Sequence, residues 1–581
     1  MSGGLYRSAN ATPDGAVPPT DEATFISAEP LNQPAVEATA PPTEQVAETS
    51  AAANSAVMAA GSLVSRGTGF LRNLMIGAAL GGGLVGNAYT TAQFLPSQVY
   101  EFLLGGVLTS VLIPVLVRRR RADADGGDAY AQRLLTLAVI ALGIAALLTV
   151  AGAELITALY ASGQSAGYTD LVNKLSYLML PMLFFTGVSA LIAAVLNTRG
   201  HFAAPMWAPI LNNLVVIGTC AIYIATFGTD LLKPEEMGMA RILVIGGGTL
   251  LGVAVQAVGL LPALRKVGFR WKWRFDFREL GLRELAKLGA WMFCYVAANQ
   301  LGLFVIVNLL TRAAGDDKAG IMIYNNVFLL IMMAHGIVAV SIITALMPRM
   351  SAAAADGRFG DITADLSRGI RTVSAVLAPI AVVYAVLSGP LSVMVFRYGA
   401  FTSESAQLTS TVLLVGALGL VPFAISQLLT FGFYALQDTR TPALVIIGVV
   451  ALRTLLQFVF YLVFPASFAA AGMMLGNAIS YLVAVAASAM LIRRRVGRLG
   501  LGRISRTVGR VALAALGAAL VGLVLVRLLP GDPAELSKPA ALLQLVIGGA
   551  AIGLTYLGLA AVLKIGEITE VIGMVRRRLG R

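Results

Sequence analysis

Two arginines, Arg66 and Arg72, lie within the first long apolar stretch of this sequence, at 56–80. An arginine near the bilayer centre costs at least ~2.5–3.5 kcal/mol on insertion scales, so two in one membrane helix need a compensating function. The usual one is a water-filled cavity that faces the interior of a helix bundle and holds an anion. Because a guanidinium group matches phosphate oxygens in a bidentate geometry, the pair could hold a diphosphate. These residues therefore indicate a transporter with an anionic cargo.

The spacing of the two arginines limits how they can act. Six residues correspond to about 600° on an ideal helix, which leaves the two side chains roughly 120° apart. A straight helix cannot aim both at one narrow cleft. Either the cavity is wide, or Gly67 and Gly69 let the helix bend or unwind. A third reading has one arginine reaching to the membrane surface.

Other polar residues recur within apolar stretches. The stretch at 86–117 carries Asn87, Gln93 and Glu101. Glu101 is either a counter-charge for an arginine or a group that meets cargo or a proton. Five amide side chains in two later stretches, together with His335, either form hydrogen bonds between helices or line a cavity. The five amides are Asn299, Gln300, Asn308, Asn325 and Asn326. We expect the cargo to contact Arg66, Arg72, Asn87, Gln93, Glu101, Asn299 and Asn326, with Arg453 a further candidate.

The composition is that of a polytopic membrane protein. Hydrophobic residues make up 57% of the 581 and charged residues only 13%, about half of the usual charged share of a soluble domain. Since irregular backbone cannot face lipid, an all-α bundle is expected. About fourteen apolar stretches are each long enough to span a bilayer. They lie near 56–80, 86–117, 133–160, 171–197, 203–227, 241–264, 286–311, 320–347, 367–388, 405–435, 442–463, 467–492, 508–529 and 540–563.

The distribution of basic residues supports this count. With both termini in the cytoplasm, roughly 32 of the 43 Lys and Arg residues fall in cytoplasmic segments, as the positive-inside rule requires. We therefore expect a multi-pass protein of the cytoplasmic membrane with these parts: a disordered cytoplasmic tail at 1–54, an N-terminal lobe at 55–264, a basic linker at 265–285, a C-terminal lobe at 286–492, the last two spans at 493–563 and a basic tail at 564–581.

Basic and aromatic residues alternate in the linker, over 265–274. This pattern is typical of an interfacial anchor, and it could also bind an anionic lipid headgroup.

Several function classes are excluded. The net charge of +13 follows from membrane topology, so no nucleic-acid partner is expected. Only two histidines, His201 and His335, and two separated cysteines argue against a metal site. No phosphate loop, GxSxG or HExxH motif is present, and Gly246–Gly248 lies in an apolar stretch where it favours helix packing. We expect no enzyme and no cofactor; transport would depend on an ion gradient, the membrane potential or consumption of the cargo.

Several segments resemble the MurJ (MviN) family of the MOP exporter superfamily, most closely its actinobacterial branch. The likeness runs from about residue 56 to beyond 495, and the characteristic segments are Ser65–Arg72, Asn87–Tyr89, Gly105–Leu116, Leu196–Thr198, Leu346–Ser351, Arg397–Phe401 and Phe433–Pro442. Asn87, Tyr100–Glu101 and Tyr324–Leu329 depart from the more cationic pattern of many relatives.

The resemblance implies two six-helix lobes around a cationic central cavity, with two C-terminal helices that form a groove for a polyprenyl tail. It implies flipping of lipid II, the undecaprenyl-diphosphate-linked disaccharide-pentapeptide, for peptidoglycan synthesis. Arg66 and Arg72 fall on the arginines of the family's first-helix motif, which meet the diphosphate. The expected partners are lipid II, membrane lipids and cell-wall synthesis proteins.

Two alternatives remain at this point. One is another cargo on the same architecture, either an oligosaccharide-lipid or an organic cation exchanged for a coupling ion. Few carboxylates lie in the spans, Glu101 and Glu154 among them, which weighs against a cation exporter. The other is a scaffold that recruits wall-synthesis enzymes without transport, which would leave the arginines without a function.

Overall fold

The computed structural model describes residues 61, 64–105, 115–116, 119–120, 123–161, 163–280, 282–313, 320–531 and 536–568, with backbone alone at 104–105 and 282–295. Contacts divide the chain into two units, 1–53 and 54–581, and all described residues belong to the second. The expected tail at 1–54 lies outside the described residues, as does the expected basic tail beyond residue 568.

Helices and their connections make up the described part, which contains no strand. A helix at 64–80 comes first. The others are α2 (Leu84–Tyr100), α4 (Asp128–Ala151), α5 (Ala153–Tyr160), α6 (Ala166–Met179), α7 (Met182–Thr198), α8 (Ala203–Phe227), α9 (Met239–Gly259), α10 (Leu261–Lys266), α11 (Leu282–Ala313), α12 (Ile321–Ala355), α13 (Phe359–Val386), α14 (Ser388–Phe396), α15 (Ser403–Ala435), α16 (Arg440–Val463), α17 (Ala469–Val496), α18 (Leu501–Leu528) and α19 (Lys538–Val562). Short π or 3-10 turns occur at Glu101–Gly105, Pro234–Glu236, Phe277–Leu280 and Ala466–Phe468.

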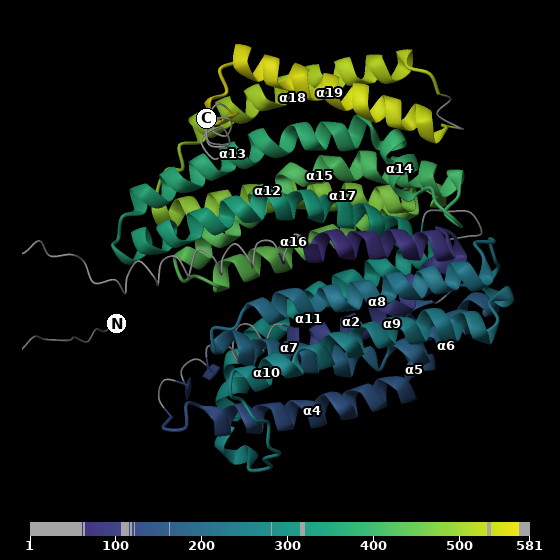
Figure 1. Ribbon diagram of the computed structural model, residues 1–581. Helices are drawn as coiled ribbons and strands as arrows, with labels where there is room; N and C mark the ends of the chain where they lie inside the picture. The colour runs from purple at the N-terminus through teal and green to yellow at the C-terminus, as the bar shows by residue number, and fades with distance from the viewer. Residues whose placement is uncertain are drawn as a thin grey trace, which may run out of the picture. The chain divides into compact units, whose positions relative to one another are not determined.

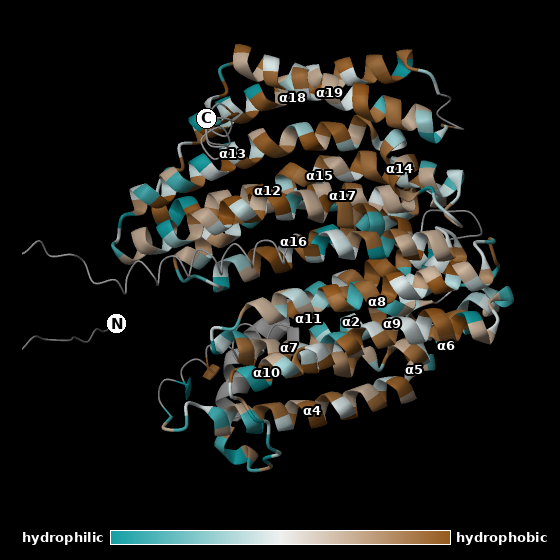
Figure 2. Cartoon of the chain, in the orientation of Figure 1, coloured by the Kyte–Doolittle hydropathy of each residue, from teal (hydrophilic) through white to brown (hydrophobic). Residues whose placement is uncertain are grey.

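Twelve helical stretches within the described residues are long and apolar enough to cross a membrane. They correspond one to one with the last twelve expected spans. The first two expected spans extend into residues that are not described, and within them the chain is helical at 64–80 and 84–105. Hydrophobic residues run along the helices, while hydrophilic residues gather mainly at their ends and in the loops (Figure 2). This distribution is what a bilayer requires of a helical bundle.

The helices pack in two groups, which we call the N-terminal lobe and the C-terminal lobe (Figure 1). In the N-terminal lobe, α2 packs on α6 and α7, α4 on α7, and α8 on α9. In the C-terminal lobe, α15 packs on α12, α13 and α17, and α16 on α17. The last two helices pair with each other and lie beside α13 and α14. The all-α fold with two lobes and a C-terminal helix pair agrees with the expectation.

Close helix packing accounts for the glycine run in α9. A methyl group on Gly248 would overlap Thr219 of α8, and one on Gly252 would overlap Asn212. Gly247, the residue before Gly248, faces open space. In lipid, where apolar burial gives little net gain between helices, small residues let backbones approach for van der Waals contact. The prediction of helix packing for this run is therefore confirmed.

Helix α11 joins the two lobes. It packs on α16 of the C-terminal lobe, and its amide side chains reach the N-terminal lobe. The Gln300 amide donates to Gln98 Oε1 of α2 at 2.6 Å, and Asn308 donates to the carbonyl of Leu159 in α5. Interhelical hydrogen bonding, one of two readings of these amides, is thus the one observed for Gln300 and Asn308.

Two glycines allow the lobes to meet at one end of the bundle. Gly81 (φ +77°) ends the helix at 64–80, and Gly399 (φ +57°) precedes α15. Their backbones approach so closely that a side chain on either would overlap the other segment. The amide of Ala400 donates to the carbonyl of Ala78 at 2.8 Å across this junction. The lobes are therefore in contact at this end.

Candidate substrate-binding site

The two arginines of the first helix have different neighbours. The guanidinium of Arg66 occupies the space beside Gly336 of α12, where a methyl group would overlap it, and its charge acts on His335. Arg72 instead lies near Tyr89 of α2 and Cys220 of α8. As their spacing predicts, the two side chains point in different directions: Arg66 faces the C-terminal lobe and Arg72 faces the N-terminal lobe.

Neither arginine is neutralised by an acidic group. Among the described residues, no Asp or Glu oxygen lies within ion-pair distance of Arg66 or Arg72. Arg72 Nη2 donates to Asn73 Oδ1 at 3.4 Å, and its buried Nε has no partner in the described part. Glu101, considered as a counter-charge, is exposed in the π-turn after α2 and pairs with neither. A cation without a partner favours an anionic ligand.

A side chain of α8 positions the turn that carries Arg66. The buried Asn213 amide donates to the carbonyl of Ser65 at 3.2 Å and to Thr68 Oγ1 at 3.0 Å. Thr68 in turn donates to the carbonyl of Val64 at 2.9 Å. Because Asn213 is fixed in the N-terminal lobe, the Arg66 side chain is carried by that lobe and projects toward the other.

A cavity of about 460 Å³ adjoins this position on the C-terminal lobe. It is lined by His335, Val340, Ile343, Thr344, Met347, Pro348, Gln427 and Phe431. His335 both lines the cavity and interacts with Arg66. The combination of one guanidinium, one imidazole and a few hydrogen-bonding groups on an apolar wall suits an anionic group attached to a larger, partly apolar molecule.

An aromatic row extends from His335 into the C-terminal lobe. The His335 ring lies 4.6 Å from the ring of Phe423, which lies 4.8 Å from that of Tyr481. The Tyr481 hydroxyl hydrogen-bonds with Arg453 of α16. Arg453, expected as a cavity residue, thus supports the wall behind His335 rather than lying beside Arg66.

The remaining predicted residues do not form one cluster. Asn87 is fully buried, and its Oδ1 accepts from the Met322 amide at 3.0 Å, which links α2 to the start of α12. Asn326, one turn further along α12, is 2% exposed and its Nδ2 has no partner in the described part. Gln93 and Asn299 are half-buried on α2 and α11. Asn87 therefore joins the two lobes instead of lining an open cavity.

Sequence reasoning left His335, Gly336 and Asn213 out of the expected site. His335 was noted only as one polar residue among several. The missing information is which helix faces Arg66, since Gly336 lies 270 positions later in the chain. The available signal was that His335 is one of only two histidines and lies within an apolar span.

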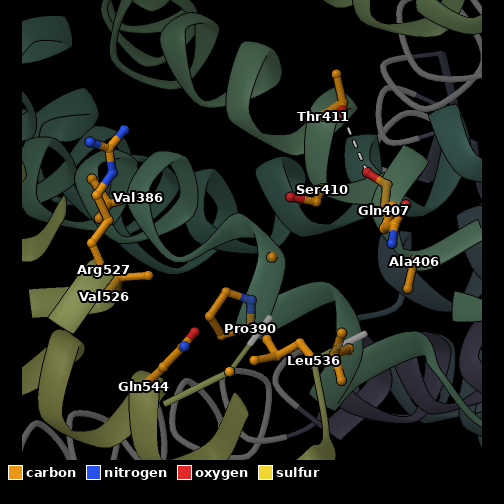
Figure 3. A pocket seen from close by; sticks show the side chains of 13 residues that line it. Val386, Pro390, Ala406, Gln407, Ser410, Thr411, Val526, Arg527, Leu536 and Gln544 are labelled. Carbon is orange, nitrogen blue, oxygen red and sulfur yellow. Dashed lines mark hydrogen bonds between the residues drawn. The ribbon is translucent and has the colours of Figure 1, made fainter. Parts of the chain in front are cut away.

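A second cavity, of about 580 Å³, lies between the C-terminal lobe and the last two helices (Figure 3). Val386, Pro390, Val393 and Val526 form an apolar part of its lining, and Ser410, Thr411, Gln407 and Gln544 add polar groups. Arg527, at the end of α18, supplies the one charged side chain in the described lining. Such a lining can take an apolar chain with a polar or anionic end.

Comparison with known proteins agrees with this architecture. The profile of the family described as lipid II flippase MurJ matches residues 76–534, a range that begins just after the two arginines. A lipid II flippase MurJ of Burkholderia cenocepacia is 28% identical over 406 residues, covering 68% of this chain and 76% of the relative. A probable lipid II flippase MurJ of Rhizobium tropici is 28% identical over 533 residues, covering 89% and 95%.

Solved structures show the same fold. A lipid II flippase MurJ in an inward closed conformation superposes with a TM-score of 0.70 at 19% identity, covering 88% of this chain and 99% of that one. An inward-facing multidrug resistance MATE family transporter of the MOP superfamily gives 0.58 at 16% identity, covering 74% and 94%. Since the family profile covers most of the chain, this protein belongs to the lipid II flippase MurJ family.

Proposed function

We propose that this chain flips lipid II, moving the undecaprenyl-diphosphate-linked disaccharide-pentapeptide from the inner to the outer leaflet of the cytoplasmic membrane. The observation that carries the proposal is the position of Arg66. Its guanidinium has no acidic partner in the described part, projects from one lobe toward the other, and adjoins a largely apolar cavity. A diphosphate supplies the missing negative charge, and two oxygens of one phosphate fit one guanidinium.

In this proposal Arg66 binds the diphosphate in the conformation described. Arg72 joins it only if the first helix turns or unwinds, because the two side chains now face different lobes. A Cβ atom added at Gly67 would meet nothing within 4 Å, and one added at Gly69 would meet only Asn213 at ordinary contact distance. Neither glycine is held by close packing on another helix, and glycines are frequent sites of helix bending. Gln93, Glu101 and Asn299 remain candidates for contacts with the sugar or peptide. Asn87 is assigned to the junction between the lobes, since it accepts from the Met322 amide, and Asn326 is buried close by on α12.

The polyprenyl tail is assigned to the cavity beside the last two helices. Helices α18 and α19 form part of its wall, and they carry exposed apolar residues that include Leu513, Leu516, Leu520 and Leu554. A long isoprenoid chain would otherwise have to fit inside the bundle with the headgroup. Separate places for head and tail let the headgroup cross while the tail stays in lipid.

We propose that the headgroup crosses by alternating access. The contact between Ala78 and Ala400 closes one end of the bundle, and this end is the extracytoplasmic one if both termini are cytoplasmic, as the basic residues predict. Breaking that contact would open the site outward. The described residues include no group of three or more His, Cys, Asp or Glu side chains that could hold a metal. The membrane potential or an ion gradient is the proposed energy source.

Depletion of the protein from its host tests this proposal. Lipid II should accumulate in the inner leaflet, and wild-type protein should reverse the accumulation while Arg66→Ala at equal abundance should not. Normal distribution of lipid II during depletion would contradict the proposal. Accumulation of a different diphosphate-linked oligosaccharide lipid would instead support the related cargo considered above.

A further inference from the structure

A row of exposed aromatic rings follows α10 in the N-terminal lobe. Trp271, Trp273 and Phe275 occupy alternate positions of the non-helical segment at 269–276, and their neighbouring rings lie side by side. The ring centroids of Trp271 and Trp273 are 4.8 Å apart, and those of Trp273 and Phe275 are 6.3 Å apart. Trp273 is 57% exposed and Phe275 is 66% exposed. We call residues 270–275 the aromatic strip.

The strip is fixed to α4 by hydrogen bonds. Gln132 Nε2 donates to the carbonyl of Arg270 at 2.8 Å, and Arg274 Nε donates back to Gln132 Oε1 at 2.9 Å. The Arg274 amide and the Trp271 indole both donate to Thr136 Oγ1, at 3.2 and 3.4 Å. The exposed rings are therefore held in one orientation rather than hanging from a free loop.

Both ends of the strip are anchored as well. Phe269 before it and Leu280 after it are 1% and 2% exposed in the core of the N-terminal lobe. Arg133 forms ion pairs with Asp276 and Glu279 just beyond the strip. The hydrogen bond from Arg133 holds the pKa of Asp276 below its ordinary value, so this anchor stays ionised at neutral pH.

The strip lies at the level where α4 enters the membrane. Its contact residue Thr136 precedes the exposed apolar side chains Ile144, Leu147 and Leu148 of the same helix. At 1.5 Å per residue, Thr136 and Ile144 are about 12 Å apart along the axis. Aromatic rings at this depth beside a span lie in the headgroup region of a bilayer.

Basic side chains without partners surround the rings. Arg265, Lys266, Arg270 and Lys272 are all exposed, and none has an ion pair within the described part of the chain. The sequence from 265 to 275 contains no acidic residue. The next two acids along the chain, Asp276 and Glu279, are paired with Arg133, and Asp125 lies near Arg274 rather than among these four cations. An uncompensated basic cluster beside a membrane span attracts anionic lipid at about 1 kcal/mol per cation, which is roughly a fivefold enrichment each.

We propose that the aromatic strip is a binding surface for anionic phospholipid. The rings lie among the headgroups, and Arg270 and Lys272 contact lipid phosphates beside them. The surface recruits these lipids to the N-terminal lobe independently of lipid II, because it lies at the linker and shares no residue with the Arg66 site.

Tryptophan quenching in lipid nanodiscs tests the proposal. The variant Trp207→Phe/Trp291→Phe leaves Trp271 and Trp273 as the only tryptophans. It is placed in two kinds of nanodisc, both made of phosphatidylcholine with a minority of phosphatidylglycerol. In one kind only the phosphatidylcholine is brominated, and in the other only the phosphatidylglycerol is brominated. Quenching per brominated lipid should be several-fold greater for phosphatidylglycerol, and salt should reduce this preference.

Two charge variants in the same background complete the experiment. Arg270→Gln/Lys272→Gln should bring the preference close to one. Arg493→Gln/Arg494→Gln, which removes two exposed cations from the end of α17, should leave it unchanged. Equal quenching by both lipids in the protein that keeps Arg270 and Lys272 would overturn the proposal, because the strip would then be a membrane anchor that does not distinguish anionic from zwitterionic lipid. Absence of quenching by either lipid, or equal effects of both charge variants, would also overturn it.

Discussion

The guanidinium of Arg66 lies where a side chain at Gly336 would otherwise be, so a residue of the N-terminal lobe fits into a gap in α12 of the C-terminal lobe. The fit depends on the absence of a Cβ atom at position 336. It also depends on Asn213, which fixes the turn that carries Arg66. The central charge of the proposed site therefore bridges the two lobes that must separate during transport.

Filling the gap should act on the site without unfolding the protein. Gly336→Ala places a methyl group on the flexible end of the Arg66 side chain, which can move away at little cost. We expect binding of a diphosphate lipid to weaken about tenfold, as for loss of one charge-assisted hydrogen bond. Gly247→Ala, in open space, is the matched control. Binding by native mass spectrometry checks this, and wild-type affinity in Gly336→Ala would argue against the assigned position of Arg66.

Removing the Asn213 amide should mislocate Arg66 while its charge is kept. Asn213→Ala removes the donor that ties the Ser65 carbonyl and the Thr68 hydroxyl to α8, and we expect a loss of about 1–3 kcal/mol in stability. Binding of the diphosphate lipid should weaken together with it. Asn213→Asp keeps the size but not the donor, so it should behave like Asn213→Ala. Thermal unfolding and lipid binding measured on the same samples would contradict this if both stayed at wild-type values.

The two lobes should need to separate between Ala78 and Ala400 during transport. In a background with Cys220 and Cys294 replaced by alanine, Ala78→Cys/Ala400→Cys should form a disulfide, since the backbones of the two residues are hydrogen-bonded. We expect oxidised protein to lose transport and reductant to restore it. Undiminished transport by fully cross-linked protein would exclude opening at this end.

Packing of α8 on α9 should depend on Gly248 and not on Gly247. Gly248→Leu forces a side chain into Thr219, whereas Gly247→Leu meets open space. We expect the first to destabilise the protein by about 1–3 kcal/mol, the usual cost of overpacking, and the second to have little effect. Melting temperatures in detergent compare the two variants. Equal melting temperatures would show that α9 is not packed as described.

The anchor of the aromatic strip should be insensitive to pH in the physiological range. Asp276 has a folded pKa below the ordinary value of 3.8 because Arg133 donates to it. A carboxyl group whose pKa is lowered in the folded state stabilises the fold at pH values above its ordinary pKa. This contribution to the free energy of unfolding is lost as the pH falls through the folded-state pKa. Emission of Trp271 and Trp273 should therefore stay constant from pH 8 to about 5, and Asp276→Asn should shift it throughout. A transition near pH 6 would contradict this.

The spans could be predicted because apolar length alone determines them. All twelve membrane helices in the described residues coincide with expected stretches. The divergence of Arg66 and Arg72 followed from helical geometry, and the packing of the Gly246–Gly248 run followed from its apolar context. These features depend on residues close together in sequence.

Contacts between distant segments could not be predicted. A buried asparagine in a membrane helix can line a cavity or bond to another helix, and the outcome for Asn87 depends on where α12 begins. Helix α11 hydrogen-bonds to the N-terminal lobe although it packs with the C-terminal one. His335 meets Arg66 only because the lobes close on each other, a relation that no local pattern carries.

The most direct test is flipping of labelled lipid II by purified protein in liposomes. Flipping is measured as the fraction of labelled lipid that a membrane-impermeant quencher can reach. Wild-type protein should equilibrate lipid II between leaflets, Arg66→Ala should slow this at least about tenfold, and Arg66→Lys should fall between them because it keeps the charge without the bidentate geometry. Phosphatidylcholine bearing the same label should not move. Transport of lipid II by Arg66→Ala at the wild-type rate would contradict the account.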